Sequence, residues 1–133
     1  MNRFDTFHYK ILTMTTQEVA DKFDQLANAN QWDKIQDELY SDDAESIEPP
    51  NAEMSGLKTV KGKAALKEKS KQFNEMIEEM FGGFCSKPVV GGNYFSVAMG
   101  MDVKFKGMER MNMDEICVYE VKDGKIVKEQ FFF

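Results

Sequence analysis

The sequence predicts an α+β fold: a cone-shaped, curled antiparallel sheet wrapped around N-terminal helices, with an internal cavity. Apolar residues recur at helical spacing in the first part of the chain, the period changes to two after Gly83, and turn sequences separate the later segments. Helices followed by a meander of strands are typical of an α+β fold with segregated layers. A long meander that covers a helix must curl, and a curled sheet capped by helices leaves room for a cavity.

Two helices are expected near the start of the chain. Thr15 is a favourable N-cap, and Glu18 three residues later completes a capping box. The apolar stripe of this helix consists of Val19, Phe23 and Leu26. A second, shorter helix is predicted from about Trp32 to Tyr40, and residues 41–43 are typical of a turn that follows it.

A short strand and a long helix come next. Residues 44–48 are predicted to form the strand, because the prolines at 49–50 cannot donate hydrogen bonds to a sheet. A loop then runs to Gly62. The long helix is expected from Lys63 to about Phe81, before the glycine pair at 82–83. Its inward stripe is Leu66, Ser70, Phe73, Ile77 and Met80.

The rest of the chain alternates with the period of a β-strand. Strands are predicted at roughly 84–90, 93–105, 109–121 and 126–133. Turns separate the last three, and the Asp-Gly pair in the final turn is typical of a tight hairpin.

Composition bounds the function. The 133 residues carry a net charge of −6 and no run of basic residues, so a nucleic-acid partner or an anionic membrane surface is not expected. No apolar stretch is long enough to cross a membrane. Two cysteines make no disulfide framework, which favours a reduced, cytoplasmic setting. Residues 1–13 are interpreted as an N-terminal extension before one domain at 14–133. This extension holds the one histidine, His8, so a histidine triad or zinc site is not expected.

Three segments, 28–44, 59–66 and 116–133, resemble the SnoaL-like proteins of the nuclear transport factor 2-like superfamily. The resemblance implies a cone with its working residues inside, in a superfamily that includes isomerases, dehydratases, polyketide cyclases and non-catalytic binders. It places Glu48, just before Pro49, at the general-base position of the isomerases. It also places Cys117, two residues before Tyr119, where isomerases and cyclases carry an acid. A thiol is a poor donor, which argues against ketosteroid isomerase or standard aldol cyclase chemistry.

Strand phase points to two more carboxylates. Glu115 shares a predicted face with Met111, Met113, Cys117, Tyr119 and Val121. Glu129 shares a face with Val127, Phe131 and Phe133. Burial would raise the pKa of either group toward neutrality, where a carboxyl group can shuttle a proton. Two alternatives remain: a structural pair with Lys67 or Lys71, or a bulge that turns either carboxylate to solvent. For Glu48 the alternative is a loop carboxylate that caps a backbone amide.

These observations predict a small-molecule pocket protein that needs neither a metal nor a cofactor. The candidate enzyme classes are isomerase, cyclase and hydrolase. Glu48 is the candidate base, with Glu115 or Glu129 as partner and Tyr119 as orienting group. The candidate ligand-binding residues are Trp32, Met99, Met113, Cys117 and Phe131. A wall rich in Met and Phe implies a small apolar or aromatic ligand. Trp32 is alternatively core between helices, and Tyr119 and Met99 are alternatively wall and core.

The opposite sheet face carries apolar residues as well. They are Tyr94, Ala98, Ile116, Val118 and Phe132. A sheet face open to water would carry more charge, so a partner is expected to cover this one. Superfamily members often pair through this sheet, which implies a homodimer. The alternative function is therefore a non-catalytic binder or a dimeric interaction domain.

Overall fold

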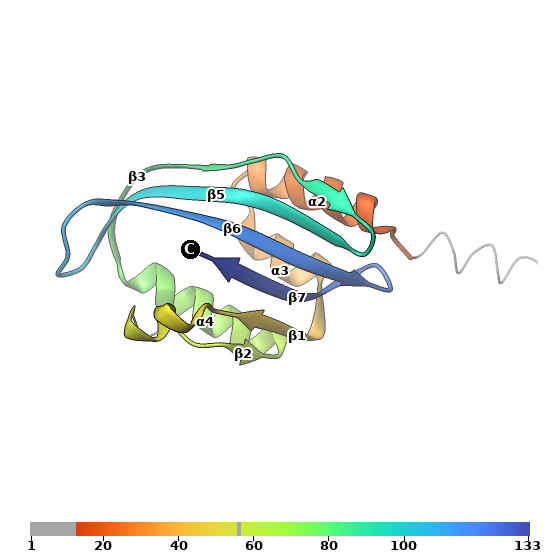
Figure 1. The fold of residues 1–133 in the computed structure, drawn as a ribbon, viewed down its shortest axis with the longest axis horizontal. Helices are drawn as coiled ribbons and strands as arrows, with labels where there is room; N and C mark the ends of the chain where they lie inside the picture. Colours follow the sequence, from red (N-terminus) through yellow and green to blue (C-terminus); the bar gives the residue numbers. More distant parts are fainter. Residues whose placement is uncertain (1–12, 56) are drawn as a thin grey trace, which may run out of the picture.

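The computed structural model describes residues 13–55 and 57–133. His8 and all but the last residue of the expected extension at 1–13 lie outside this range. The described residues form three α-helices, a short 3₁₀ helix at Pro50–Ser55, and a curled, unclosed sheet of seven strands. Figure 1 shows the helices together on one side of the sheet. The predicted α+β cone is therefore confirmed.

The first two helices begin and end close to their predicted positions. Helix α2 spans Thr16–Asn28 and helix α3 spans Trp32–Leu39. The capping box is present: the Glu18 amide donates to Thr15 Oγ1 at 3.1 Å, and the Thr15 amide donates to Glu18 Oε1 at 2.9 Å. Both helices bury one apolar face against the sheet, and Phe23 of α2 lies at the centre of the core.

Helix α4 is shorter than the sequence pattern predicts. It spans Lys63–Glu75 and is followed at once by strand β3, Ile77–Cys85, so the expected helix over 77–81 is wrong. The strand pairs antiparallel with β5, from Ile77 opposite Phe105 to Cys85 opposite Met99. The 3–4 spacing of apolar residues continues past Glu75, but pairing with a distant strand overrides that local pattern.

The sheet has the order β2-β1-β7-β6-β5-β3, with the short β4 also paired to β5. The remaining strands are β1 (Tyr40–Ile47), β2 (Val60–Lys61), β4 (Val89–Gly91), β5 (Tyr94–Phe105), β6 (Met111–Lys122) and β7 (Lys125–Phe132). Strands β1 and β7 run parallel, so the sheet is mixed rather than wholly antiparallel.

Strand β1 starts earlier than predicted. The expected turn at 41–43 lies inside the strand, in a stretch where the register with β7 shifts between Tyr40 and Glu45. Residues with turn preference are tolerated there because an irregular stretch frees them from the ladder. β1 ends at Ile47, one residue before the predicted end at Glu48, and the prolines follow.

A bulge sets the face of the last strand. Val121 pairs with Ile126, whereas Glu120 pairs with Lys128, so Val127 is the extra residue. Ile126 is therefore on the inner face, and the prediction that Val127 lies there is wrong. The same bulge keeps Glu129 opposite Tyr119 on the inner face.

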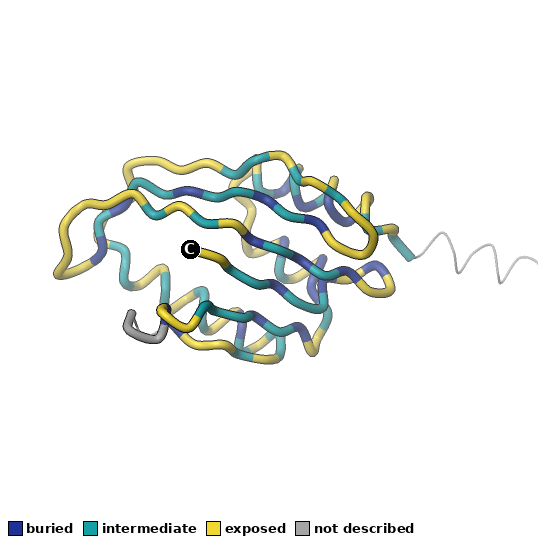
Figure 2. Tube along the Cα trace, in the orientation of Figure 1, coloured by how far each residue is buried: buried dark blue, intermediate teal, exposed yellow. Residues whose placement is uncertain are grey.

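Burial follows the predicted alternation along β5 and β6. Phe95, Val97, Cys117 and Tyr119 are buried, while Tyr94 and Ile116 are exposed. Figure 2 shows buried positions spaced along the middle strands and exposed positions at the hairpins. No helix among the described residues is long and apolar enough to cross a membrane.

Candidate functional site

A cavity of about 1150 Å³ lies between the helices and the inner face of the sheet. Aromatic and sulfur-containing side chains form a large part of its wall, among them Phe23, Phe73, Tyr119, Met99, Met101 and Met113, and polar side chains of α3 line it as well. Trp32 and Asp33, both exposed, also line it, so the cavity opens to solvent at the start of α3. This geometry suits a small, largely apolar molecule.

A smaller cavity of about 130 Å³ adjoins the large one and shares several lining residues with it. Three carboxyl groups line the small cavity, those of Glu48, Glu115 and Glu129, and we call them the acid cluster. Glu115 and Glu129 also line the large cavity. The acid cluster therefore lies where the small cavity meets the large one.

Glu129 is buried, and side chains bind both of its oxygens. Tyr40, at the start of β1, donates its hydroxyl hydrogen bond to Oε1. Ser46, further along β1, donates to Oε2 at 3.1 Å. Burial raises the pKa of Glu129, while the hydrogen bond from Tyr40 is the strongest opposing effect. The parallel pairing of β1 with β7 places Ser46 directly opposite Glu129, which makes this contact possible.

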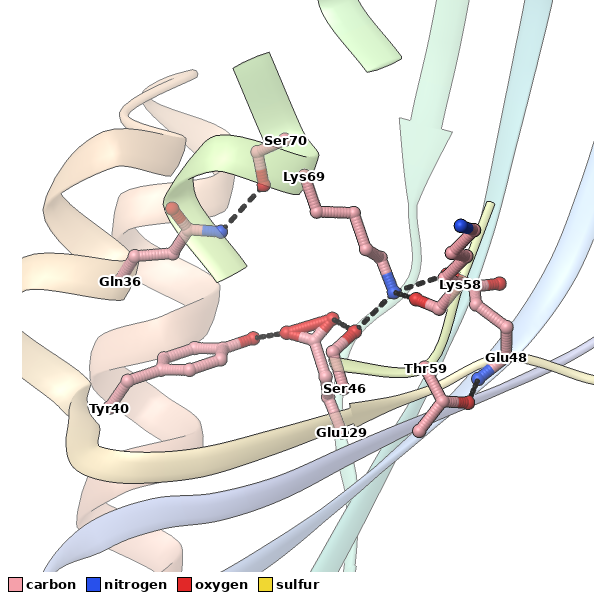
Figure 3. Close-up of polar contacts among 9 residues, drawn as sticks. All are labelled: Gln36, Tyr40, Ser46, Glu48, Lys58, Thr59, Lys69, Ser70 and Glu129. Atoms are coloured by element: carbon pink, nitrogen blue, oxygen red, sulfur yellow. Dashed lines mark hydrogen bonds and ion pairs between the residues drawn. The ribbon is translucent and has the colours of Figure 1, made fainter. Parts of the chain in front are cut away.

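Glu48 is held by an ion pair. Its Oε1 lies 2.7 Å from Nζ of Lys69 on α4, and the two side chains are only 6% and 14% exposed. The Glu48 amide donates to Thr59 Oγ1 at 3.0 Å, which fixes the chain where β1 ends. Figure 3 shows Lys69 reaching down from α4 toward Glu48 and Ser46. The expected alternative of a carboxylate that caps a backbone amide is not what the contacts show.

Glu115 lies on β6 opposite Met99 of β5, half-buried in the cavity wall. Burial raises the pKa of its carboxyl group to about 7, and the negative charge of Glu48 adds to this effect. A hydrogen bond from the Cys117 thiol works in the opposite direction. Glu115 therefore changes its protonation state near neutral pH, as a proton-transfer group must.

Comparison with known proteins identifies the fold family. A family model described as a SnoaL-like domain matches residues 14–133. The chain belongs to the SnoaL-like family. No curated protein sequence matches the chain.

Solved structures agree with this assignment. A Mesorhizobium loti protein, provisionally named a SnoaL-like polyketide cyclase, is 34% identical over 90% of this chain and 100% of that chain, with a TM-score of 0.82. TerC co-crystallised with polyporic acid is 18% identical, over 89% of this chain and 90% of that chain, with a TM-score of 0.70. An NTF2-like protein of unknown function from Burkholderia pseudomallei is 15% identical, over 90% and 92%, with a TM-score of 0.72. The last two likenesses show the fold alone.

The SnoaL-like cone brings most of the predicted site residues to the cavity. Tyr119, Met99, Met113 and Phe131 line it, together with Glu115 and Glu129. Tyr119 is buried and stacks on Phe95, with ring centroids 4.8 Å apart, so its ring forms part of the wall.

Of the other two predicted ligand-binding residues, Trp32 lines the large cavity and Cys117 lines neither cavity. Trp32 is 38% exposed at the cavity opening and meets Phe23 edge to face, so it does not form core between helices. Cys117 is wholly buried, and it is not one of the described residues that line the two cavities. Burial raises the pKa of its thiol, which therefore stays protonated.

Sequence reasoning missed three polar residues of this SnoaL-like site: Tyr40, Ser46 and Lys69. It placed Tyr40 at the end of a helix, and it considered Lys67 and Lys71 as partners for the carboxylates. Lys67 instead pairs with Asp37, and within the described residues no ion pair joins a lysine to Glu115 or Glu129. One signal was present: Lys69 follows Leu66 by three residues and so lies near the inward stripe of α4.

No group of three or more His, Cys, Asp or Glu side chains in residues 13–55 and 57–133 is arranged to hold a metal ion. The acid cluster is included in this statement: Lys69 pairs with Glu48, and the hydroxyl groups of Tyr40 and Ser46 bind Glu129.

Proposed function

We propose that this SnoaL-like protein transfers a proton within a small, uncharged, largely aromatic molecule, in an isomerisation or a cyclisation. The observation that carries the proposal is Glu115, a carboxyl group with a pKa raised to about 7 in the wall of a large aromatic cavity. A base whose pKa lies near the working pH combines a useful ionised fraction with useful basicity.

The ligand class follows from the lining of the cavity. Aromatic and methionine side chains favour flat, apolar molecules. Glu115 and Glu129 have no cationic partner in direct contact among the described residues, so an anionic ligand would be repelled. The name of the Mesorhizobium loti relative, a SnoaL-like polyketide cyclase, is in keeping with a cyclisation.

The roles differ from those that sequence alone suggested. Lys69 engages the carboxylate of Glu48, so we assign the role of base to Glu115. Glu115 takes a proton from the carbon beside a ligand carbonyl, and the electron pair of the C–H bond moves to the carbonyl oxygen. In an isomerisation the proton returns to another carbon of the ligand. In a cyclisation the new enolate carbon attacks a second carbonyl, and the resulting alkoxide takes the proton back from Glu115. This route differs from standard aldol cyclase chemistry, because Cys117, at the position of the acid, does not line the cavity and takes no part in it. Tyr119 supplies wall, and Glu129 anchors β1 to β7.

A general probe of carboxylate bases tests this assignment without knowledge of the natural ligand. 5-Nitrobenzisoxazole is flat and uncharged; loss of its C3 proton to a base breaks the N–O bond and gives a coloured cyanophenolate. The rate should rise with pH around a midpoint near 7, because Glu115 must be ionised. Glu115→Gln should remove this activity, and Glu120→Gln, which changes the opposite face of β6, should keep it. A fully active Glu115→Gln variant would exclude Glu115 as the base.

We also propose that the protein is a homodimer that pairs through the outer sheet face. The apolar residues exposed on this face are the observation that favours a role as an interaction domain. Tyr94, Ile116 and Phe132 are 51%, 46% and 49% exposed on neighbouring strands. Multi-angle light scattering should give twice the chain mass, and Ile116→Lys should give a monomer. A wild-type monomer at micromolar concentration would refute the dimer.

Both cysteines are free thiols, which supports a cytoplasmic location.

A further inference from the structure

Lys69 is the one cation among the described residues that line the small cavity, and it faces three carboxyl groups. Carboxyl groups that share such a space cannot all be ionised, because each charge raises the pKa of its neighbours. The position of the lysine among them therefore decides which group carries the charge.

The position of Lys69 is not symmetrical. Its Nζ lies 2.7 Å from Glu48 Oε1, donates to Ser46 Oγ at 2.7 Å and donates to the Lys58 carbonyl at 3.1 Å. An ammonium group has three donors, so these contacts use all of them. The same group lies 5.5 Å from the centre of the Phe131 ring, which adds a further favourable contact.

Ser46 lies between Lys69 and Glu129, and the charge of Lys69 also lowers the pKa of Glu129. The Ser46 hydroxyl accepts from Lys69 and donates to Glu129 Oε2, so the lysine fixes the direction of this hydrogen bond. Figure 3 shows the chain of contacts from Tyr40 through Glu129 and Ser46 to Lys69. Glu115 makes no ion pair with Lys69 in the described part of the chain.

We propose that Lys69 is a positioning residue that keeps Glu48 ionised and thereby leaves the exchangeable proton of the acid cluster on Glu115. The proposal builds on the proposed function, in which Glu115 is the base. The three carboxyl groups then have different roles: Glu48 holds a fixed negative charge, Glu129 is hydrogen-bonded to β1, and Glu115 exchanges the proton.

Removal of the ammonium group should move the proton. In Lys69→Met, Glu48 is left buried without a counter-ion and takes up a proton, because an unpaired buried charge is costly. Glu115 then loses the repulsion of the Glu48 charge and the attraction of the Lys69 charge. Of the groups that face it, Glu48 and Glu129 raise its pKa, whereas Cys117 and Lys69 lower it. Glu48 exerts the strongest of the charge effects and Lys69 the weakest, so the pKa of Glu115 falls.

Carbon NMR of protein labelled at the glutamate carboxyl carbons tests this directly. The resonances are assigned with Glu48→Gln and Glu115→Gln. In Lys69→Met, the Glu115 titration should move to lower pH by about one pH unit, and the Glu48 resonance should move toward that of a protonated carboxyl group. Lys69→Arg should restore the wild-type pattern. Lys67→Met, which removes only the exposed pair with Asp37, should leave it unchanged.

A Glu48 that stays ionised in Lys69→Met, or a Glu115 titration that moves upward or not at all, would overturn the proposal. Lys69→Gln, which keeps hydrogen-bonding capacity without charge, gives the same comparison if the Met variant does not fold. The titration needs no turnover. If the titrations shift as expected but the protein does not catalyse the reaction of 5-nitrobenzisoxazole, the proposed function is wrong and the role of Lys69 still holds.

Discussion

Replacing Glu115 with glutamine should stabilise the folded protein at high pH and change its stability little at low pH. Folding raises the pKa of this carboxyl group from 4.5 to about 7, chiefly by burial. The folded state therefore holds the proton more tightly than the unfolded state. Stability from this group is present in full below pH 4.5 and is lost as the pH rises through about 7.

The magnitude follows from the pKa difference. Each pH unit corresponds to about 1.4 kcal/mol, so ionised Glu115 costs the folded state at most about 3 kcal/mol at pH 8. Glutamine is neutral at every pH and nearly the same size, so it avoids this cost. The free energy of unfolding of Glu115→Gln, relative to wild type, should therefore rise by up to about 3 kcal/mol between pH 4.5 and pH 8.

Urea unfolding followed by tryptophan fluorescence, at half-unit steps of pH, measures this difference. Glu120→Gln is the matched control, because it makes the same change on the other face of β6. It should keep the pH dependence of the wild type, since Glu115 is still present. A stability difference between Glu115→Gln and wild type that is the same at every pH would refute the reasoning, because it would show that Glu115 titrates alike in both states.

Three further predictions concern the core, one turn and one thiol. Phe23→Ala should lower the free energy of unfolding by about 3–5 kcal/mol, because Phe23 is buried against three other aromatic rings; a loss under about 1 kcal/mol in urea titration would contradict this packing. Gly124→Ala should lower stability by about 1 kcal/mol or more, since its φ is +75° and a Cβ would lie 2.9 Å from the Met14 nitrogen. Gly91→Ala is the control, because a Cβ there meets open space and should have a much smaller effect; equal melting temperatures for the two variants would count against the argument. Cys117 should react with a thiol reagent at pH 8 only after denaturant is added; rapid labelling of the native protein would show that the site opens.

Strand phase was the most informative signal in the sequence. Alternation along β6 placed Glu115 on the inner face, and the capping box at Thr15 located the start of α2. Both signals are local, since a strand shows its buried face every second residue and a helix cap lies within one turn. Glu129 was also placed inside, although the bulge at Val127 gives that result for a different reason from the one assumed.

The features that sequence reasoning missed all depend on contacts between distant segments. Residues 77–81 continue a helical pattern, and only pairing with β5 makes them a strand. The role of Lys69 depends on how α4 packs across β1. This packing brings Lys69 into contact with Glu48 and Ser46, which precede it by 21 and 23 positions in the chain. Ser46 in turn meets Glu129 only because β1 and β7 are parallel neighbours. No local periodicity encodes such pairings.

The position of β7 has a consequence for how the molecule is assembled. Although β7 follows all the other strands in sequence, it lies between β1 and β6 and connects them. Without it the sheet would fall into two pieces, β2–β1 and β6–β5–β3, with no ladder between them. Closing this gap joins residues more than 80 positions apart, such as Ser46 and Glu129, which is entropically slow. Earlier intermediates should therefore expose the edge of β1, and a chain truncated before Lys125 should aggregate rather than form a smaller cone.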